Sequence, residues 1–183
     1  AELKEKERAA ESCYHIMSAS HPADSLHPYL SREGVKPYGA YSYKGMILIP
    51  VINKSCSLIN IQFISEDGSK RFKKGCQTIG GMSWISPFIS KDCDIVVCEG
   101  YATGATIAEA LSLPVCGSFS SHNLPIVGAS IRESMSNRII IACDNDDILI
   151  PAPTPDEPYR KVKSNPGMDA AKKASVTSNT IIM

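Results

Sequence analysis

Residues 94–117, DIVVCEGYATGATIAEALSLPVCG, decide the fold, because an apolar run, a glycine-bearing turn and a helical pattern follow one another directly. The pattern predicts a strand over 95–98, a helix over 101–112 and a short strand over 115–117. It then repeats with a helix near 124–135 and the apolar run IIIAC at 139–143. Strands that alternate with helices in this way are typical of βαβ units built on a parallel sheet.

The segment before this stretch has a different period. Two apolar runs, MILIPVI at 46–52 and SLINIQFI at 57–64, precede the turn Glu66-Asp67-Gly68-Ser69 and a third run at 70–73. They predict a three-stranded antiparallel meander. Pro50 cannot donate a backbone hydrogen bond, so we expect an edge position or a bulge there.

Helical patterns flank the meander and end the chain. We expect a surface helix over 2–19, a short helix around 26–33 and an alanine-rich helix that opens at Asn165-Pro166-Gly167. Residues 147–164 are rich in proline and predict an inserted loop. A last strand over 180–183 reaches the final residue, so we expect the sequence to be a fragment, truncated inside its second domain.

Charge is divided between two halves of the chain. Residues 1–91 hold 12 basic and 8 acidic residues, whereas residues 92–183 hold 7 basic and 11 acidic residues. The net charge of zero excludes a basic surface over the whole chain. Chance explains the counts alone equally well, but the division matches an expected boundary near Lys91.

Seven cysteines occur without a Cys-x-x-Cys pair, which argues against a zinc module and a disulfide framework. Cys98, Cys116 and Cys143 lie within or beside apolar runs, as buried thiols of a reducing compartment do, and this predicts a cytoplasmic location. The apolar runs are far shorter than the roughly 20 residues that span a bilayer, so no membrane partner is expected.

Three acids follow the two long strands of the second half. Glu99 comes directly after IVVC, Asp144 comes directly after IIIAC, and Asp146 lies two residues further on. The carboxyl ends of parallel strands share one edge, so these carboxylates converge if the strands are neighbours. Oxygen ligands of this kind suit magnesium and phosphoryl transfer. Taken singly, each acid also has a structural explanation as a cap or turn residue.

Two glycines and a polar loop have less specific patterns. Gly100 and Gly104 are compatible with a turn whose amides approach phosphate, and also with a tight turn made for packing. The sequence contains no P-loop and no Gly-x-Gly-x-x-Gly motif. Ser121 and His122 do not indicate a hydrolase, because no Gly-x-Ser-x-Gly elbow is present; His122 reads as a loop or capping residue.

Lys70-Arg71-Phe72-Lys73-Lys74 places four positive charges around one aromatic ring. Such a segment suits the phosphates of a single nucleic-acid strand, with Phe72 available for a base to stack on. The alternative is an edge strand that lysines keep from aggregating.

The acidic motifs carry a family resemblance. Val97-Cys98-Glu99-Gly100 and Ala142-Cys143-Asp144-Asn145-Asp146 resemble the Toprim domain of topoisomerases and primases. The resemblance implies that Glu99 acts as a general acid or base and that Asp144, Asp146 and Glu99 hold Mg²⁺ or Mn²⁺. The family places a glycine soon after its Asp-x-Asp pair, whereas here residues 147–166 intervene before Gly167, which we take as the equivalent.

Within that family the chain is most similar to DNA primases of plasmid and phage type. The similarity lies in Glu99–Gly104 with the helix that follows and in Asn165-Pro166-Gly167. The meander with its basic end is similar to the subdomain that precedes the Toprim unit in bacterial-type primases. That subdomain carries a lysine that meets nucleotide or template; Lys70 is the matching position, and Lys73 and Lys74 are weaker candidates.

The resemblance implies an α/β fold in which a Toprim-like parallel sheet, flanked by helices, follows a smaller basic α+β subdomain. It implies an enzyme, a DNA primase that makes short RNA primers on single-stranded DNA from nucleoside triphosphates, with a replicative helicase as a candidate partner. Candidate nucleic-acid or nucleotide contacts are Lys70, Arg71, Lys73, Lys74, Gly100 and Gly167. The alternatives are a Toprim nuclease or topoisomerase-related protein, and a non-catalytic nucleic-acid-binding module.

Overall fold

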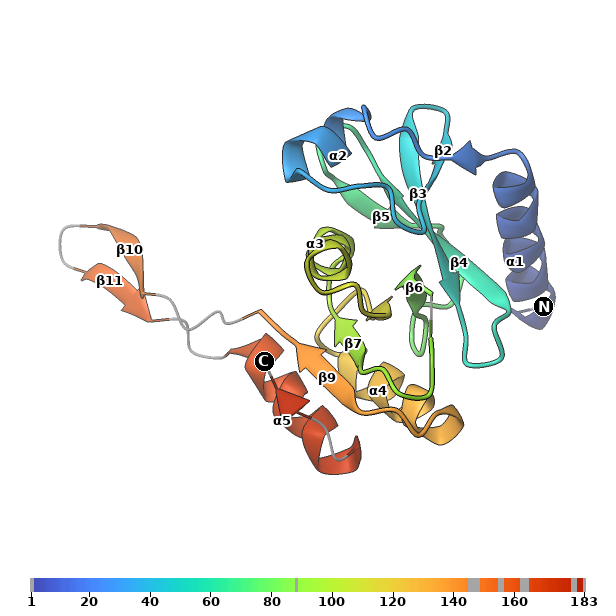
Figure 1. Ribbon diagram of the computed structural model, residues 1–183. Coiled ribbons are helices and arrows are strands. Elements are labelled where there is room, and N and C mark those ends of the chain that lie inside the picture. The colour runs from blue at the N-terminus through green and yellow to red at the C-terminus, as the bar shows by residue number, and fades with distance from the viewer. Residues whose placement is uncertain are drawn as a thin grey trace.

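The computed structural model describes residues 2–87, 89–144, 149–154, 157–161, 165–178 and 181–182. In these residues the chain forms two five-stranded sheets and a separate two-stranded hairpin (Figure 1). None of the described helices is long and apolar enough to cross a membrane.

The first sheet is an antiparallel meander in the order β1-β2-β3-β4-β5. Its strands are β1 (His21–Pro22), β2 (Tyr41–Tyr43), β3 (Met46–Ile52), β4 (Leu58–Ile64) and β5 (Lys70–Phe72). The three predicted strands are confirmed as β3, β4 and β5. β1 and β2 were not predicted, because two or three residues such as Tyr-Ser-Tyr give no recognisable run.

Pro50 lies in β3 where the sheet has a local edge. β2 pairs only with Met46–Leu48, so β4 is the one strand beside Pro50. A register shift follows between Val51 and Ile52. Pro50 has no N–H to donate, and it lies where β3 is unpaired on one side and close to a bulge, so both expectations are partly confirmed.

The two faces of the first sheet are covered differently. Helix α1 (Glu2–Ser18) packs on one face, where Cys13 joins Leu48, Ile61 and Phe63 in a cluster of buried residues. The other face turns toward α2 (Pro28–Glu33) and the second sheet. Helix α2 begins at a proline, which is preorganised for the first turn, and its C-cap Gly34 has a φ of 66°.

The second sheet has the order β12-β9-β7-β8-β6. Its strands are β6 (Ser83–Ser86), β7 (Ile95–Cys98), β8 (Val115–Gly117), β9 (Ile139–Ala142) and β12 (Ile181–Ile182). Four of the strands run parallel, but β6 pairs antiparallel with β8. The expectation of a wholly parallel sheet is corrected to a mixed one, because β6 lies at the edge, where an antiparallel strand is common.

Helices cover both faces of the second sheet. Helix α3 (Tyr101–Leu111) lies on the face toward the first sheet, and α4 (Leu124–Ser134) and α5 (Pro166–Ser178) lie on the other. All four residues of β7 are buried, as expected for a central strand sandwiched between helices. The helices predicted at 101–112 and 124–135 and the alanine-rich helix are confirmed within about two residues.

The predicted inserted loop contains regular structure. β10 (Leu149–Thr154) and β11 (Glu157–Lys161) pair antiparallel as a hairpin, separate from both five-stranded sheets (Figure 1). These two strands were not predicted, because a proline within a segment argues against a strand there.

The two sheets meet in a common interior. One apolar cluster combines Tyr29 and Ile64 from the first part with Val96 and Tyr101 from the second. Backbone hydrogen bonds of 2.8 and 2.9 Å also join Ile52 to Met82. The division into domains near Lys91 stays a prediction, although β6, which precedes that residue, pairs within the second sheet.

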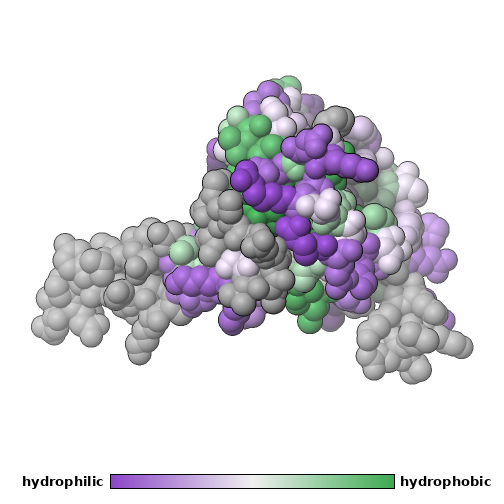
Figure 2. Space-filling view, turned by 60° about the horizontal axis from the view of Figure 1, so that its bottom comes forward, coloured by the Kyte–Doolittle hydropathy of each residue, from purple (hydrophilic) through white to green (hydrophobic). Residues whose placement is uncertain are grey.

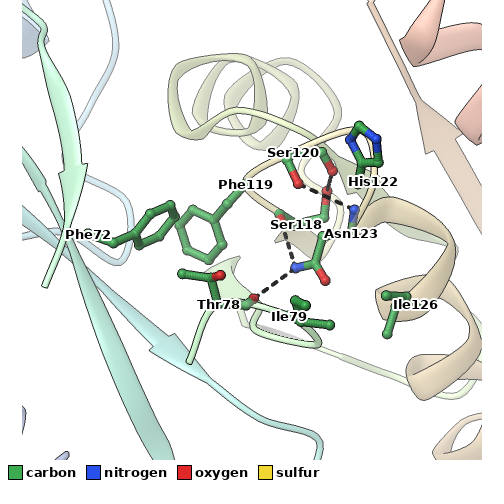
Figure 3. A pocket seen from close by; sticks show the side chains of 9 residues that line it. All are labelled: Phe72, Thr78, Ile79, Ser118, Phe119, Ser120, His122, Asn123 and Ile126. Atoms are coloured by element: carbon green, nitrogen blue, oxygen red, sulfur yellow. Dashed lines mark hydrogen bonds between the residues drawn. The ribbon is translucent and has the colours of Figure 1, made fainter. Parts of the chain in front are cut away.

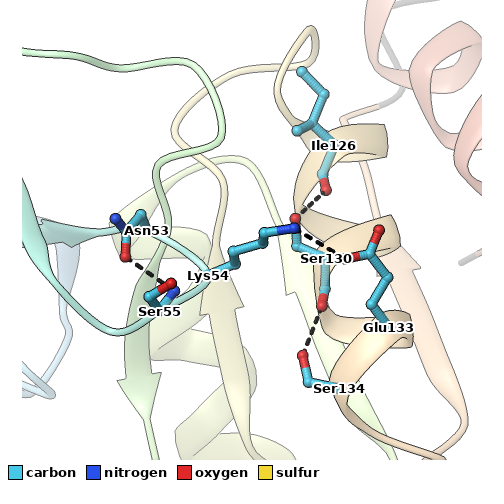
Figure 4. A network of polar contacts seen from close by, with 7 residues as sticks. All are labelled: Asn53, Lys54, Ser55, Ile126, Ser130, Glu133 and Ser134. Carbon is cyan, nitrogen blue, oxygen red and sulfur yellow. Dashed lines mark hydrogen bonds and ion pairs between the residues drawn. The ribbon is translucent and has the colours of Figure 1, made fainter.

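Two exposed ion pairs cross between the same parts of the molecule. Lys36 Nζ lies 2.6 Å from Glu109 on α3, and Lys54 Nζ lies 3.3 Å from Glu133 on α4 (Figure 4). Exposed pairs of long side chains contribute little to stability and are screened by salt. The common apolar interior, not these ion pairs, therefore holds the two sheets together.

Candidate active site at the carboxyl edge of the second sheet

The parallel strands β7 and β9 are neighbours, as convergence of the predicted acids requires. Cys98 pairs in register with Ala142, so Glu99 and the segment Cys143-Asp144 leave the sheet at the same edge. Glu99 is held by its own strand and by its carbonyl oxygen, which accepts a hydrogen bond of 2.8 Å from the amide of Phe119. The sheet topology thus brings together two of the three predicted acids.

Gly167 closes this edge from a distant part of the sequence. A Cβ atom on Gly167 would lie 3.1 Å from Oε1 of Glu99 and 3.2 Å from the backbone nitrogen of Asp144, and closer still to the carbonyl oxygen of Asp144. Glycine therefore permits the first turn of α5 to approach both acids. Gly167 and Oε1 of Glu99 are buried, whereas Asp144 is exposed.

The thiol of Cys98 reports the proximity of the two acids. Burial, and after it the charges of Asp144 and Glu99, together raise the pKa of Cys98 to about 12. Cys98 is consequently a buried, neutral thiol, not a nucleophile.

The third predicted acid, Asp146, lies outside the described residues. In the part of the chain that the structure describes, no group of three or more histidine, cysteine, aspartate or glutamate side chains could hold a metal ion. The donors present nevertheless suit a hard divalent cation, because Mg²⁺ often uses only one or two protein carboxylates and retains several waters.

The two glycines after β7 differ in their surroundings. Gly100 is the N-cap of α3 with a φ of −102°, and a Cβ there would lie 3.6 Å from Oγ1 of Thr103, an ordinary contact. A Cβ on Gly104 would collide with Ile85 and lie 2.9 Å from Sγ of Cys98. Gly104 thus serves close packing of α3, whereas nothing in its conformation or packing requires glycine at position 100.

The loop after β8 is fixed by one buried asparagine. Nδ2 of Asn123 donates to the carbonyl oxygens of Ser118 at 2.9 Å and Gly81 at 2.6 Å, and its Oδ1 accepts from the amide of Gly80 at 2.7 Å. A longer contact of 3.4 Å reaches the carbonyl of Thr78. Asn123 therefore joins the loop that precedes β6 to the loop that follows β8.

Replacing Asn123 by alanine is expected to lower the free energy of unfolding by about 3 kcal/mol, because several buried backbone groups lose their partner together. Urea denaturation of both proteins measures this loss. Ser130→Ala removes an exposed hydrogen bond on α4 and serves as the control, with little change expected. A loss under about 1 kcal/mol for Asn123→Ala would show that water replaces the amide.

A pocket of about 200 Å³ opens beside this loop (Figure 3). Phe72 and Phe119 form one end, with ring centroids 5.6 Å apart and planes at 80°, and Ile126 of α4 lies at the other end. Phe119 has a φ of 69°, which is unusual for a bulky residue and marks local strain. Sequence reasoning missed the pocket, because its walls come from segments far apart in the chain.

Strand alternation divides the basic segment. Lys70 and Phe72 pair with Ile64 and Gln62 and share their face, which turns toward the second sheet. Arg71 pairs with Phe63 on the face that α1 covers, and its guanidinium lies 5.6 Å from the centre of that ring. The five-residue segment therefore does not present all its charges to one ligand.

The two lysines after β5 also have different surroundings. Lys74 is exposed, whereas Lys73 is partly buried and acts on the α1 side of the sheet. Burial and then the Cys76 thiol, 3.6 Å away, raise the pKa of Cys13 to about 12, and the charge of Lys73 opposes that rise. Of the predicted basic contacts, Lys70 alone shares a face with Phe72 within β5.

The known proteins that this chain resembles in sequence are described as DNA primases. No protein-family model matches the chain. In sequence the chain is similar to DNA primase TraC of Escherichia coli, with 29% identity over 182 residues, or 94% of this chain. Another DNA primase TraC of Escherichia coli is 31% identical over 129 residues, or 66% of this chain. The chain spans 12% of the length of each of these relatives.

Solved structures share the fold at low sequence identity. The fold is similar to that of the primase fragment of the bacteriophage T7 primase-helicase protein, with a TM-score of 0.57 and 12% sequence identity. The match covers 84% of this chain and 63% of the T7 chain. A chain from the complex of the T7 lagging-strand DNA polymerase with primase domains matches 81% of this chain and 72% of its own, with 13% identity and a TM-score of 0.52. By sequence the chain is thus similar to a short part of a DNA primase, and its mixed α/β fold resembles that of a phage primase fragment.

Proposed function

We propose that this chain is the catalytic core of a DNA primase, which synthesises short RNA primers on single-stranded DNA from nucleoside triphosphates. The observation that carries the proposal is the meeting of Glu99, Asp144 and Gly167 at the carboxyl edge of β7 and β9. The sequence similarity to DNA primase TraC supports it independently.

The finer assignment is that the second sheet with its helices is a Toprim domain, residues 92–183. Its support is the order of motifs: an acid after β7, an acid after the neighbouring strand β9, and a glycine that approaches both. Asp146 belongs to the proposed site by its place in the Asp-x-Asp motif. Residues 1–91 then form the template- and nucleotide-binding subdomain.

Glu99, Asp144 and Asp146 would hold Mg²⁺ or Mn²⁺. The ion would neutralise charge on the phosphates and lower the barrier to transfer. Glu99 would accept the proton of a 3′-hydroxyl, whose oxygen then bonds to the α-phosphorus of the incoming nucleotide. The bond between the α- and β-phosphates breaks, and pyrophosphate leaves with its electrons.

Contacts to the substrates come from both parts of the chain. Lys70 shares the inward face of the first sheet with Phe72 and is our first candidate for a phosphate contact. Arg71, Lys73 and Lys74 contribute positive potential around the template. The α3 amides that begin at Gly100, and the start of α5 at Gly167, are candidate contacts to nucleotide phosphates.

Other properties of the whole protein are part of the same proposal. A replicative helicase is a candidate partner, and the buried free thiols of Cys98 and Cys116 favour a reducing, cytoplasmic environment.

A denaturing gel tests the reaction directly. The chain is incubated with end-labelled single-stranded DNA, labelled nucleotides and Mg²⁺ or Mn²⁺, with metal-free and template-free controls. We expect short new products that need both metal and template. A shortened template would instead indicate a metal-dependent nuclease, and neither product would contradict catalysis by this chain.

A further inference from the structure

We propose that the pocket with Phe72 and Phe119 at one end binds one unpaired nucleobase beside the candidate catalytic acids. The inference rests on the proposed function and adds to it a specific ligand and a specific place. Both rings are half-buried, so each leaves part of its surface open to the pocket. Stacking on exposed aromatic rings is the general way in which proteins hold single-stranded bases.

The size of the pocket suits a base. Its volume of about 200 Å³ is below the roughly 300–1,000 Å³ of sites that enclose whole drug-sized ligands. It is open on one side, so the sugar and phosphates attached to a bound base can remain outside. A single planar ring system is therefore a better occupant than an entire nucleotide.

The lining combines apolar walls with a polar rim. Five large apolar side chains are exposed among the described residues, and two of them, Ile79 and Ile126, line this pocket. Figure 2 shows one face of the molecule, on which hydrophobic patches lie beside hydrophilic residues. Thr78, Ser120 and His122 add hydroxyl and imidazole groups (Figure 3), which can bond to the polar edge of a base.

The pocket adjoins the acids through the backbone. The side chain of Phe119 lines the pocket, and its backbone amide donates a hydrogen bond of 2.8 Å to the carbonyl oxygen of Glu99. His122 lines this pocket and also a second cavity of about 260 Å³, whose lining includes Pro166 at the start of α5. A base in the pocket would therefore leave its sugar and phosphate close to the edge formed by Glu99, Asp144 and Gly167.

The pocket is formed before a ligand arrives. Asn123 ties the loop that contains Thr78 to the loop that contains Phe119, through hydrogen bonds on both sides. Preorganised walls reduce the entropy lost on binding. This explains how a small pocket can contribute measurable affinity for a single base.

A binding experiment without metal separates the base from the phosphates. Fluorescence anisotropy compares a labelled thymidine oligonucleotide with an abasic oligonucleotide of the same length and charge, in the presence of EDTA. Phe72→Leu keeps an apolar side chain but removes the ring, and we expect about 5- to 100-fold weaker binding of the oligonucleotide with bases. Binding of the abasic strand should not change.

Two further variants keep the test independent of folding. Ile79→Ser alters a side chain that is 69% exposed, so the fold should tolerate it, and base-dependent affinity should fall about threefold to tenfold. Phe63→Leu makes the same substitution as Phe72→Leu on the face covered by α1, and base-dependent affinity should not change. Thermal unfolding of each variant verifies that it is folded.

The source of the base is decided in the same experiment. Competition with ATP, repeated with Phe72→Leu, shows whether the ring affects the free nucleotide or the template strand. Equal binding of normal and abasic strands, or unchanged affinity for strand and nucleotide in both pocket variants, would overturn the proposal. Because no metal is present, base-dependent binding can succeed while primer synthesis fails, and the reverse, so the two hypotheses fail separately.

Discussion

Replacing Glu99 by glutamine is expected to reduce metal-dependent primer synthesis about a thousandfold with little change in thermal stability. The amide has the shape of the carboxylate but cannot accept the proton of a 3′-hydroxyl, and general-base catalysis contributes about 10²–10⁴-fold. Asp144→Asn is expected to act chiefly on the metal, because a neutral amide is a weaker ligand for Mg²⁺ than a carboxylate.

The denaturing gel measures synthesis in these variants, and a Mn²⁺ titration measures the affinity of each for metal. Glu109→Gln is the matched control, because Glu109 lies on α3 and pairs with exposed Lys36, outside the site. We expect its synthesis to equal that of the unaltered chain. Glu99→Gln with normal synthesis would show that another group takes the proton, and unchanged metal affinity in Asp144→Asn would leave that acid with a purely structural role.

Replacing Gly167 by alanine is expected to lower primer synthesis at least about a hundredfold. The new methyl group would collide with the carbonyl oxygen of Asp144 and press on Oε1 of Glu99, so α5 or the acids must move. A displacement of about 1 Å in a catalytic group can cost about a hundredfold in rate. Overpacking of this kind also lowers the free energy of unfolding by about 1–3 kcal/mol.

Gly128→Ala provides the matched control for Gly167→Ala. Gly128 lies within α4, and a Cβ there would meet only Cδ1 of Ile141 at 3.8 Å. Alanine is the better helix former by about 0.5–1 kcal/mol, so this variant should be at least as stable as the unaltered chain and fully active. Full synthesis by Gly167→Ala, measured in the same assay as Gly128→Ala, would show that α5 is not part of the site.

Sequence reasoning performed best where burial leaves a continuous signal. β7 and β8 were predicted at their observed positions, and β9 within one residue, because central parallel strands are apolar on both faces. β6 was missed, since Ser83–Ser86 has only four residues and its two serines flank two large apolar residues without alternation. β6 is an edge strand and pairs with one neighbour only, so it does not require a longer apolar run.

The candidate site was predictable as far as sheet topology determines it. Glu99 and Asp144 each follow one of two neighbouring parallel strands, so both must lie at the same edge of the sheet. The position of each acid after its strand was therefore enough to predict that they meet. The basic segment shows the opposite case, because residues adjacent in sequence, such as Lys70 and Arg71, point to opposite faces of a strand. The pocket could not be predicted, since Phe72 and Phe119 meet only through tertiary packing.

The apolar interior common to the two sheets has a consequence for the rate of ligand capture. Because Tyr29 and Ile64 pack in one cluster with Val96 and Tyr101, the position of the first sheet relative to the second is set during folding. Separating the two sheets would expose that interior to water. We expect association to be limited by diffusion and by the flexibility of the incoming strand, with no slow opening of the protein beforehand.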